Sequence, residues 1–129
     1  MTAPAKRILV VEDDDVGARV LHDLLVAHGY EVETARTGSA GLEAWKQERW
    51  DLMIVDVLLP VMNGFELCRM VKSARPGPAT PVILISAAYR HPERDPAYAR
   101  RALGADAYLC KPFELDDLLT QVHALVGEA

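Results

Sequence analysis

Short apolar runs alternate five times with longer amphipathic segments along the chain, and short polar links separate them. Most of the apolar runs lack polar positions on either face, which is typical of parallel strands covered by helices on both sides. The runs predict strands over residues 7–12, 31–35, 51–56, 81–86 and 106–110. The segments between them predict helices over residues 15–28, 39–48, 64–74, 95–104 and 114–126.

Residues that favour helix ends flank several of these segments. Asp15 is the expected N-cap of the first helix and Gly29 its stop, and Ser39 is expected to cap the second helix. Asp95 and Pro96 form a favourable helix start before the fourth helix. The buried stripes of the first and last helices are predicted to be Leu21, Leu24, Leu25 and His28, and Leu115, Leu118, Leu119, Val122 and Val126.

Five strand–helix units predict an α/β fold with a doubly wound, open, parallel five-stranded sheet, because crossovers between parallel strands are right-handed. With 129 residues, 50% of them hydrophobic, the chain has enough apolar material for one core. No internal domain boundary is evident, so residues 1–129 are expected to form a single domain.

Charge and cysteine usage exclude several classes of protein. A net charge of −5 disfavours an electrostatic nucleic-acid binder, which needs a basic surface. No apolar segment approaches the roughly 18 residues of a membrane span, and the N-terminus has no apolar targeting core. Cys68 and Cys110 do not form a Cys-x-x-Cys pair, so we expect two free thiols and a cytoplasmic location.

Polar residues lie at the ends of four predicted strands. Glu12 and Asp13 end the first, Asp56 the third, Ser86 the fourth and Lys111 the fifth. The carboxyl ends of parallel strands share one edge of the sheet, so these side chains are expected to converge. Three neighbouring carboxylates repel one another unless a cation intervenes, either Lys111 or a divalent ion such as Mg²⁺. Taken alone, the acidic run from Glu12 to Asp15 fits a solvated helix start equally well.

Asp56 is the strongest of these signals because it directly follows a buried strand, where an unpaired charge is costly. A carboxylate can act as a nucleophile toward phosphorus. Such a transfer needs the charge on the phosphoryl oxygens to be neutralised. Mg²⁺ held by Asp13 and Asp56, together with Lys111, can supply that neutralisation, and the Ser86 hydroxyl can donate a hydrogen bond to the phosphoryl group.

These motifs together resemble the receiver domain of two-component response regulators, of the chemotaxis-regulator type. The matching segments are Val10-Val11-Glu12-Asp13, Val55-Asp56 with Pro60 and Gly64, Ile85-Ser86-Ala87, and Lys111-Pro112-Phe113. The resemblance extends over a core of about residues 6–126. It implies a flavodoxin-like fold with strand order 2-1-3-4-5, acting as a phosphoacceptor module that changes its surface on phosphorylation.

The resemblance also implies a role for each site residue. Asp56 is the expected phosphoacceptor, and Mg²⁺ is expected to be bound by Asp13, Asp56, the backbone carbonyl of Leu58 and, through water, Glu12. Ser86 and Tyr108 are the expected switch residues; without the resemblance, Tyr108 reads as a half-buried tyrosine on an edge strand. Lys111 is the expected lysine of the phosphorylation site, and its bond to Pro112 is expected to be cis.

The partners implied by the resemblance are proteins. They are a histidine kinase or histidine phosphotransfer protein as donor, a downstream protein target or an output domain, and a second copy through the face of the fourth and fifth helices. Two alternatives remain open: a small phosphohydrolase with Asp56 as nucleophile, and an interaction domain that works without phosphorylation. A phosphohydrolase commonly needs a second acid two residues after the nucleophile, and Leu58 occupies that position.

Two departures from the family pattern affect details. The segment from Tyr89 to Arg94 is longer than the pattern by about three residues, which points to unusual partner recognition there. Leu58 and Ala88 are apolar at the two variable positions beside the phosphorylation site. Because apolar side chains there exclude an attacking water, we expect a long-lived phosphorylated form.

Overall fold

The computed structural model describes residues 4–74, 80–87 and 104–127. The strands are β1 (Arg7–Val11), β2 (Glu31–Ala35), β3 (Leu52–Asp56), β4 (Val82–Ala87) and β5 (Ala107–Lys111). The helices are α1 (Asp15–Ala27), α2 (Gly38–Gln47), α3 (Gly64–Ser73) and α5 (Leu115–Val126). The helix predicted over residues 95–104 lies outside the described residues except for Gly104, and so do Ala88 and the segment from Tyr89 to Arg94.

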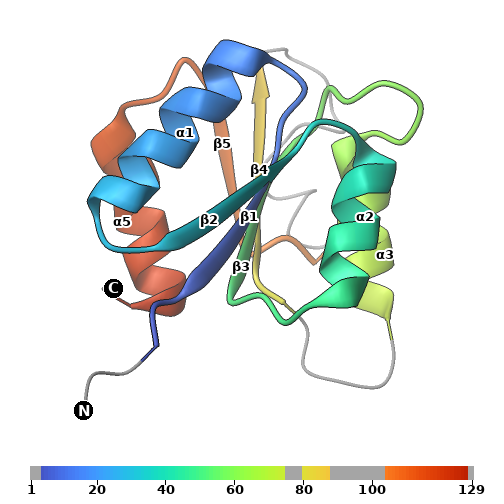
Figure 1. Ribbon diagram of the computed structural model, residues 1–129. Coiled ribbons are helices and arrows are strands. Elements are labelled where there is room, and N and C mark those ends of the chain that lie inside the picture. The colour runs from blue at the N-terminus through green and yellow to red at the C-terminus, as the bar shows by residue number, and fades with distance from the viewer. Residues whose placement is uncertain (1–3, 75–79, 88–103, 128–129) are drawn as a thin grey trace.

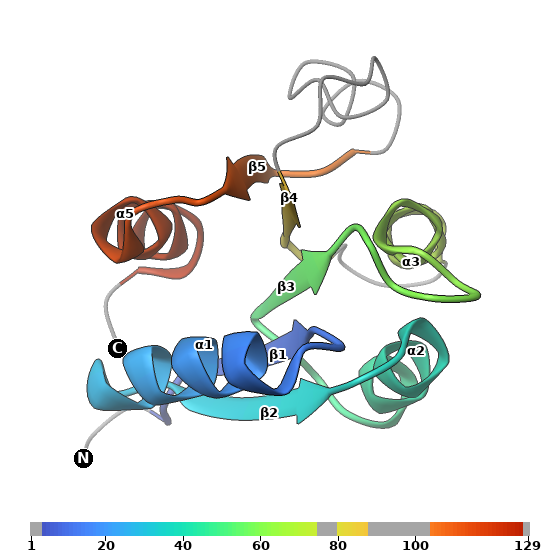
Figure 2. The same cartoon turned by 90° about the horizontal axis from the view of Figure 1, so that it is seen from above.

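The strands form one sheet in the order β2-β1-β3-β4-β5, and all four pairs are parallel. Helices α1 and α5 cover one face and α2 and α3 the other, as Figures 1 and 2 show. This arrangement confirms the predicted doubly wound α/β fold and its strand order. The register pairs Val11 with Val55 and Asp56 with Ile85, so the carboxyl ends of the central strands lie at one edge.

Two hydrophobic clusters fill the space between the sheet and its two helical layers. On the α1–α5 side, Ile8, Val10, Ile54 and Ile85 pack with helix residues such as Leu25 and Leu118. On the α2–α3 side the cluster includes Leu9, Val11, Met53, Val55 and Leu67. Alternate residues of each central strand therefore enter opposite clusters, which explains why these strands are apolar at every position.

Two helices begin at other caps than the sequence predicts. Asp14, not Asp15, is the N-cap of α1, and its carboxylate accepts a hydrogen bond of 2.7 Å from the Gly17 N–H. Asp15 is the first helical residue and pairs with Arg36. Thr37, not Ser39, caps α2 and accepts from the Ala40 N–H at 3.0 Å. Each segment offers neighbouring residues able to cap, and the path of the preceding strand selects between them.

The predicted buried stripes are only partly confirmed. Leu21, Leu25, Leu118, Leu119 and Val122 are buried, and Leu24 and Val126 are partly buried. His28 is wrongly placed by the sequence prediction: it lies beyond the end of α1 and is exposed. Leu115 is 40% exposed, because the first turn of α5 lies beside a groove instead of against the sheet. None of the described helices has the length and apolar character needed to cross a membrane.

Candidate functional site

The carboxyl edge of the sheet brings together the acidic residues that the sequence singled out. Carboxylate oxygens of Glu12, Asp13 and Asp56 all lie within 4.8 Å of one another. Glu12 and Asp56 are buried, whereas Asp13 is exposed. Ser86 is fully buried on β4, one residue beyond Ile85, the register partner of Asp56. The predicted convergence is therefore confirmed.

Lys111 connects the two buried acids. Its Nζ donates to Glu12 Oε1 at 2.7 Å and to Asp56 Oδ2 at 3.0 Å. The backbone N–H of Leu58 donates to the other Asp56 oxygen, Oδ1, at 2.9 Å. Glu12 Oε2 is buried and has no hydrogen-bond partner among the described residues. Three carboxylates beside one ammonium leave an excess of negative charge when all are ionised.

Burial and these contacts give the two buried acids opposite pKa shifts. The pKa of Glu12 is raised to about 7, because burial and contact with Asp56 raise it by more than Lys111 lowers it. Burial also raises the pKa of Asp56, but interactions with Glu12, the Leu58 N–H and Lys111 lower it by more, so its net shift is downward. The pKa of Lys111 is raised, since its hydrogen bonds to Glu12 and Asp56 outweigh the opposing effect of burial. At neutral pH Asp56 is therefore an ionised carboxylate beside a charged ammonium.

Two glycines allow the close packing that holds these acids in place. A Cβ atom on Gly64 would lie 2.3 Å from the backbone oxygen of Asp56, so only glycine fits at this start of α3. The Gly64 N–H donates to the Val57 oxygen at 2.9 Å, which closes the loop that follows Asp56. A Cβ atom on Gly17 would lie 3.0 Å from Glu12 Oε1. Gly17 was not among the residues predicted from the sequence, although a glycine in the first turn of a helix can signal close approach.

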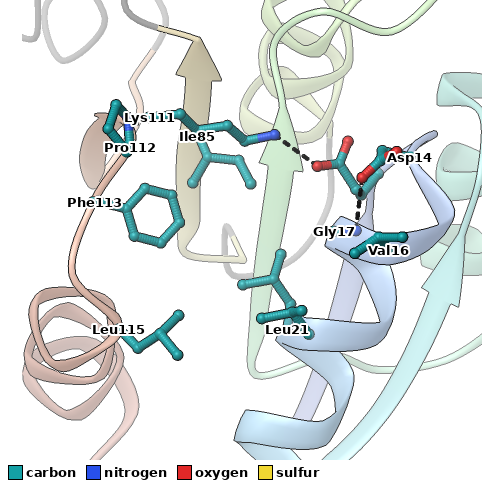
Figure 3. Close-up of a pocket in the computed structure, with 11 residues that line it drawn as sticks. Asp14, Val16, Gly17, Leu21, Ile85, Lys111, Pro112, Phe113 and Leu115 are labelled. Carbon is teal, nitrogen blue, oxygen red and sulfur yellow. Dashed lines mark hydrogen bonds and ion pairs between the residues drawn. The ribbon is translucent and has the colours of Figure 1, made fainter.

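A groove opens beside the acidic cluster, between α1 and the segment that leads from β5 to α5 (Figure 3). Its volume is about 480 Å³. Val16 and Leu21 of α1 face Phe113 and Leu115 across it, while the Lys111 side chain extends toward the acids (Figure 3). Val16 is 71% exposed. An apolar surface therefore adjoins the charged site.

The remaining predicted residues differ in their outcome. Tyr108 is buried on the edge strand β5, so the alternative interpretation of a half-buried tyrosine is wrong about its burial. Leu58 is 42% exposed beside Asp56. The Lys111–Pro112 bond is cis, as expected. Neither Cys68 nor Cys110 is in a disulfide, as expected; the first is buried and the second exposed.

Comparison with known proteins agrees with this geometry. Residues 8–123 match the response regulator receiver domain family. The response regulator ArlR of Staphylococcus aureus is 35% identical over 123 residues, which cover 93% of this chain and 52% of ArlR. The chain therefore spans about half the length of the curated relatives it matches.

Solved structures of receiver domains superpose over nearly the whole chain. Chemotaxis response regulator CheY4 of Vibrio cholerae has a TM-score of 0.83 and 31% identity, and the match covers 95% of this chain and 99% of CheY4. The receiver domain of the sensor histidine kinase PA1611 of Pseudomonas aeruginosa has a magnesium ion coordinated in its active site cleft. Its TM-score is 0.83 at 26% identity, over 97% of this chain and 100% of that domain. The matched segment, residues 8–123, contains the whole cluster from Glu12 to Lys111, and this chain belongs to the response regulator receiver domain family of two-component systems.

Proposed function

We propose that this chain accepts a phosphoryl group on Asp56 from a phosphohistidine of a histidine kinase or histidine phosphotransfer protein. The observation that carries the proposal is the state of Asp56. Its buried carboxylate is held ionised by Lys111 and the Leu58 N–H, beside two further acids. When they are ionised, the two further acids repel the Asp56 carboxylate, a cost that a purely structural ion pair with Lys111 would not carry.

In the transfer, an oxygen of the Asp56 carboxylate attacks phosphorus and the histidine nitrogen departs, so a P–O bond forms as the P–N bond breaks. Because this reaction requires no strong base, the low pKa of Asp56 suits it. The Lys111 ammonium, 3.0 Å from Asp56 Oδ2, is placed to neutralise charge on the incoming phosphoryl oxygens. The Ser86 hydroxyl is proposed to donate to another of these oxygens, with Tyr108 as the second switch residue.

The acidic cluster fits a hard divalent cation, which prefers carboxylate and carbonyl oxygens. The fit rests on the excess negative charge and on the buried Glu12 Oε2, which has no hydrogen-bond partner among the described residues. Asp13, Asp56 and the Leu58 carbonyl would hold Mg²⁺ directly, and Glu12 would hold it through water. When bound, the ion would neutralise part of the charge on the phosphoryl group.

The proposal favours a signalling module over a turnover enzyme. Leu58, two residues after Asp56, supplies no acid for a leaving group, which disfavours the phosphohydrolase alternative. The chain would promote its own phosphorylation and dephosphorylation and act as one receiver domain in the cytoplasm, where its thiols stay reduced. Its further partners would be a downstream protein target or an output domain. A homodimer through the fourth and fifth helices remains a proposal, since the fourth lies outside the described residues.

Acetyl phosphate provides a direct test, because a small donor needs no docking surface. Intact mass spectrometry of the Mg²⁺-loaded protein should show one added phosphoryl group, absent in Asp56→Asn and after chelation. Asp13→Ala should remain unlabelled whether or not Mg²⁺ is present. The matched control is Asp15→Asn, an exposed carboxylate that pairs with Arg36, which should be labelled as the wild type is. Persistent labelling of Asp56→Asn would exclude Asp56 as the acceptor.

A further inference from the structure

Val61 has an unusual backbone conformation near the phosphorylation site. Its φ angle is 67°, in the left-handed region, where a β-branched side chain is strained. The other positive-φ residues in the described ranges are Gly29, Gly104 and Gly127. Val61 is thus the one described side chain forced into this region, and it lies in the loop between Asp56 and α3.

Contacts of the Val61 side chain within the chain do not offset this strain. Val61 is 104% exposed, as much as in an extended peptide. Its neighbours in the loop are anchored instead: Leu59 is buried, and Met62 packs against the α2–α3 hydrophobic cluster. The loop is therefore held on both sides of Val61 while this side chain projects into solvent. A strained conformation that the residue's own side-chain contacts do not offset suggests a functional contact.

The position of Val61 near Asp56 indicates the partner that its side chain contacts. Three peptide units separate Val61 from Gly64, so their Cα atoms lie within about 11 Å. Gly64 itself abuts the backbone of Asp56. A standard protein interface covers about 800 Å² on each partner, which equals a disc of about 16 Å radius. A protein that docks over Asp56 with an interface of this size is therefore expected to reach Val61.

We propose that Val61 is a specificity-determining residue that packs against an apolar surface of the phosphodonor protein. Leu58, 42% exposed, is a second exposed apolar residue of the same loop, and its N–H donates to Asp56. Because the loop is anchored on both sides, Val61 is presented in a fixed orientation and loses little conformational freedom on binding. This inference rests on the proposed function, since it requires a protein that donates to Asp56.

The test compares protein donors with a small donor. Autophosphorylated cytoplasmic portions of the histidine kinases of the source organism are each mixed with the wild-type chain, and the fastest donor is selected. Its transfer rate, divided by the rate of labelling with acetyl phosphate, is then measured for Val61→Asn, Val61→Gly and Val61→Ile. The control is Val26→Thr, since Val26 is a similarly apolar residue, 45% exposed, near the end of α1.

The rate ratio is expected to fall about tenfold or more in Val61→Asn and Val61→Gly, and to be retained in Val61→Ile and Val26→Thr. Asparagine tolerates the left-handed region, so Val61→Asn should also melt at a temperature about 4 °C higher than the wild type. An unchanged rate ratio in Val61→Asn would overturn the proposal, and so would failure of every kinase to label the wild type. Failure of acetyl phosphate to label wild-type Asp56 would instead refute the proposed function itself.

Discussion

At the scale of single residues, the site is a set of buried charges that are unequally compensated. Lys111 bonds to both buried acids, yet only Asp56 gains a second hydrogen bond, from the Leu58 N–H. Glu12 keeps one buried oxygen without a hydrogen-bond partner among the residues described. The proton of the pair therefore resides on Glu12, and the Asp56 carboxylate stays ionised.

This distribution predicts a stability that falls as pH rises from about 5 to 8 in the absence of Mg²⁺. The folded-state pKa of Glu12 is about 7, against an ordinary value of 4.5, so the folded protein binds more protons in this range than the unfolded chain does. The free energy of unfolding should drop by about 2 kcal/mol over that interval. The shifts of Asp56 and Lys111 act outside it, below about 4 and above about 10, because those are their ordinary ranges.

Urea denaturation in a chelating buffer across this pH range measures the effect. Glu12→Gln should remove most of the decline, whereas Glu43→Gln, at an exposed carboxylate, should keep it. A decline of equal size in Glu12→Gln would show that another group binds the proton.

The sequence predicted that Glu12, Asp13, Asp56 and Lys111 cluster, because they follow apolar runs and parallel strands bring such positions together. It could not predict Val61 or Gly17. The φ angle of Val61 depends on how the loop closes onto Gly64, and the role of Gly17 depends on how near α1 approaches Glu12. Both are distances between segments, which a hydrophobic pattern does not encode. The roles proposed for Ser86 and Tyr108 stay predictions.

At the scale of secondary structure elements, burial made the strands predictable. Strands β1, β3 and β4 are apolar on both faces, and their predicted ranges agree with the structure to within one residue. The helix starts were less certain. The run from Glu12 to Asp15 and the segment from Thr37 to Ser39 each contain several residues able to cap, and only the geometry identifies Asp14 and Thr37.

The α2 cap gives a matched pair of substitutions. Thr37→Ala should lower the free energy of unfolding by about 1 kcal/mol, because the Ala40 N–H loses its side-chain acceptor. Ser39→Ala, two residues later, should change it by less than about 0.5 kcal/mol. Chemical denaturation at one pH distinguishes the two variants. A larger loss of unfolding free energy for Ser39→Ala would show that Ser39 is the cap, as the sequence predicted.

At the scale of the whole molecule, the site and the proposed switch lie on neighbouring strands. Ser86 pairs in register with Cys110, and Tyr108 lies two residues before it, so these three side chains share one face of the sheet. A phosphoryl group on Asp56 that draws Ser86 toward it would favour a state in which Tyr108 repacks. Because β5 lies at the edge of the sheet and pairs with β4 alone, we expect the conformational change at β5 rather than at the centre of the sheet.

Hydrogen exchange can locate that response. Phosphorylation with acetyl phosphate should change exchange in β4, β5 and α5 of the wild type, and should leave α2 as it was. The same treatment of Asp56→Asn should change neither region, and Ser86→Ala should be phosphorylated with a weaker change in β5. Changes confined to α2 would place the switch toward the β2 edge of the sheet instead of at β5.

The hydrogen bond from Tyr30 Oη to the Gly127 carbonyl, 2.7 Å long, has a practical consequence. The next residue, Glu31, donates its N–H to the Lys6 carbonyl at 2.9 Å. Lys6 and Gly127 therefore lie close together, beside the start of β2. That place is the amino edge of the sheet, and Figure 1 shows both chain ends on this side, whereas Asp56 ends β3 at the carboxyl edge. If the protein is immobilised on a sensor surface through either of these ends, its acidic cluster would face the solution. Soluble donors could then be assayed without obstruction by the support.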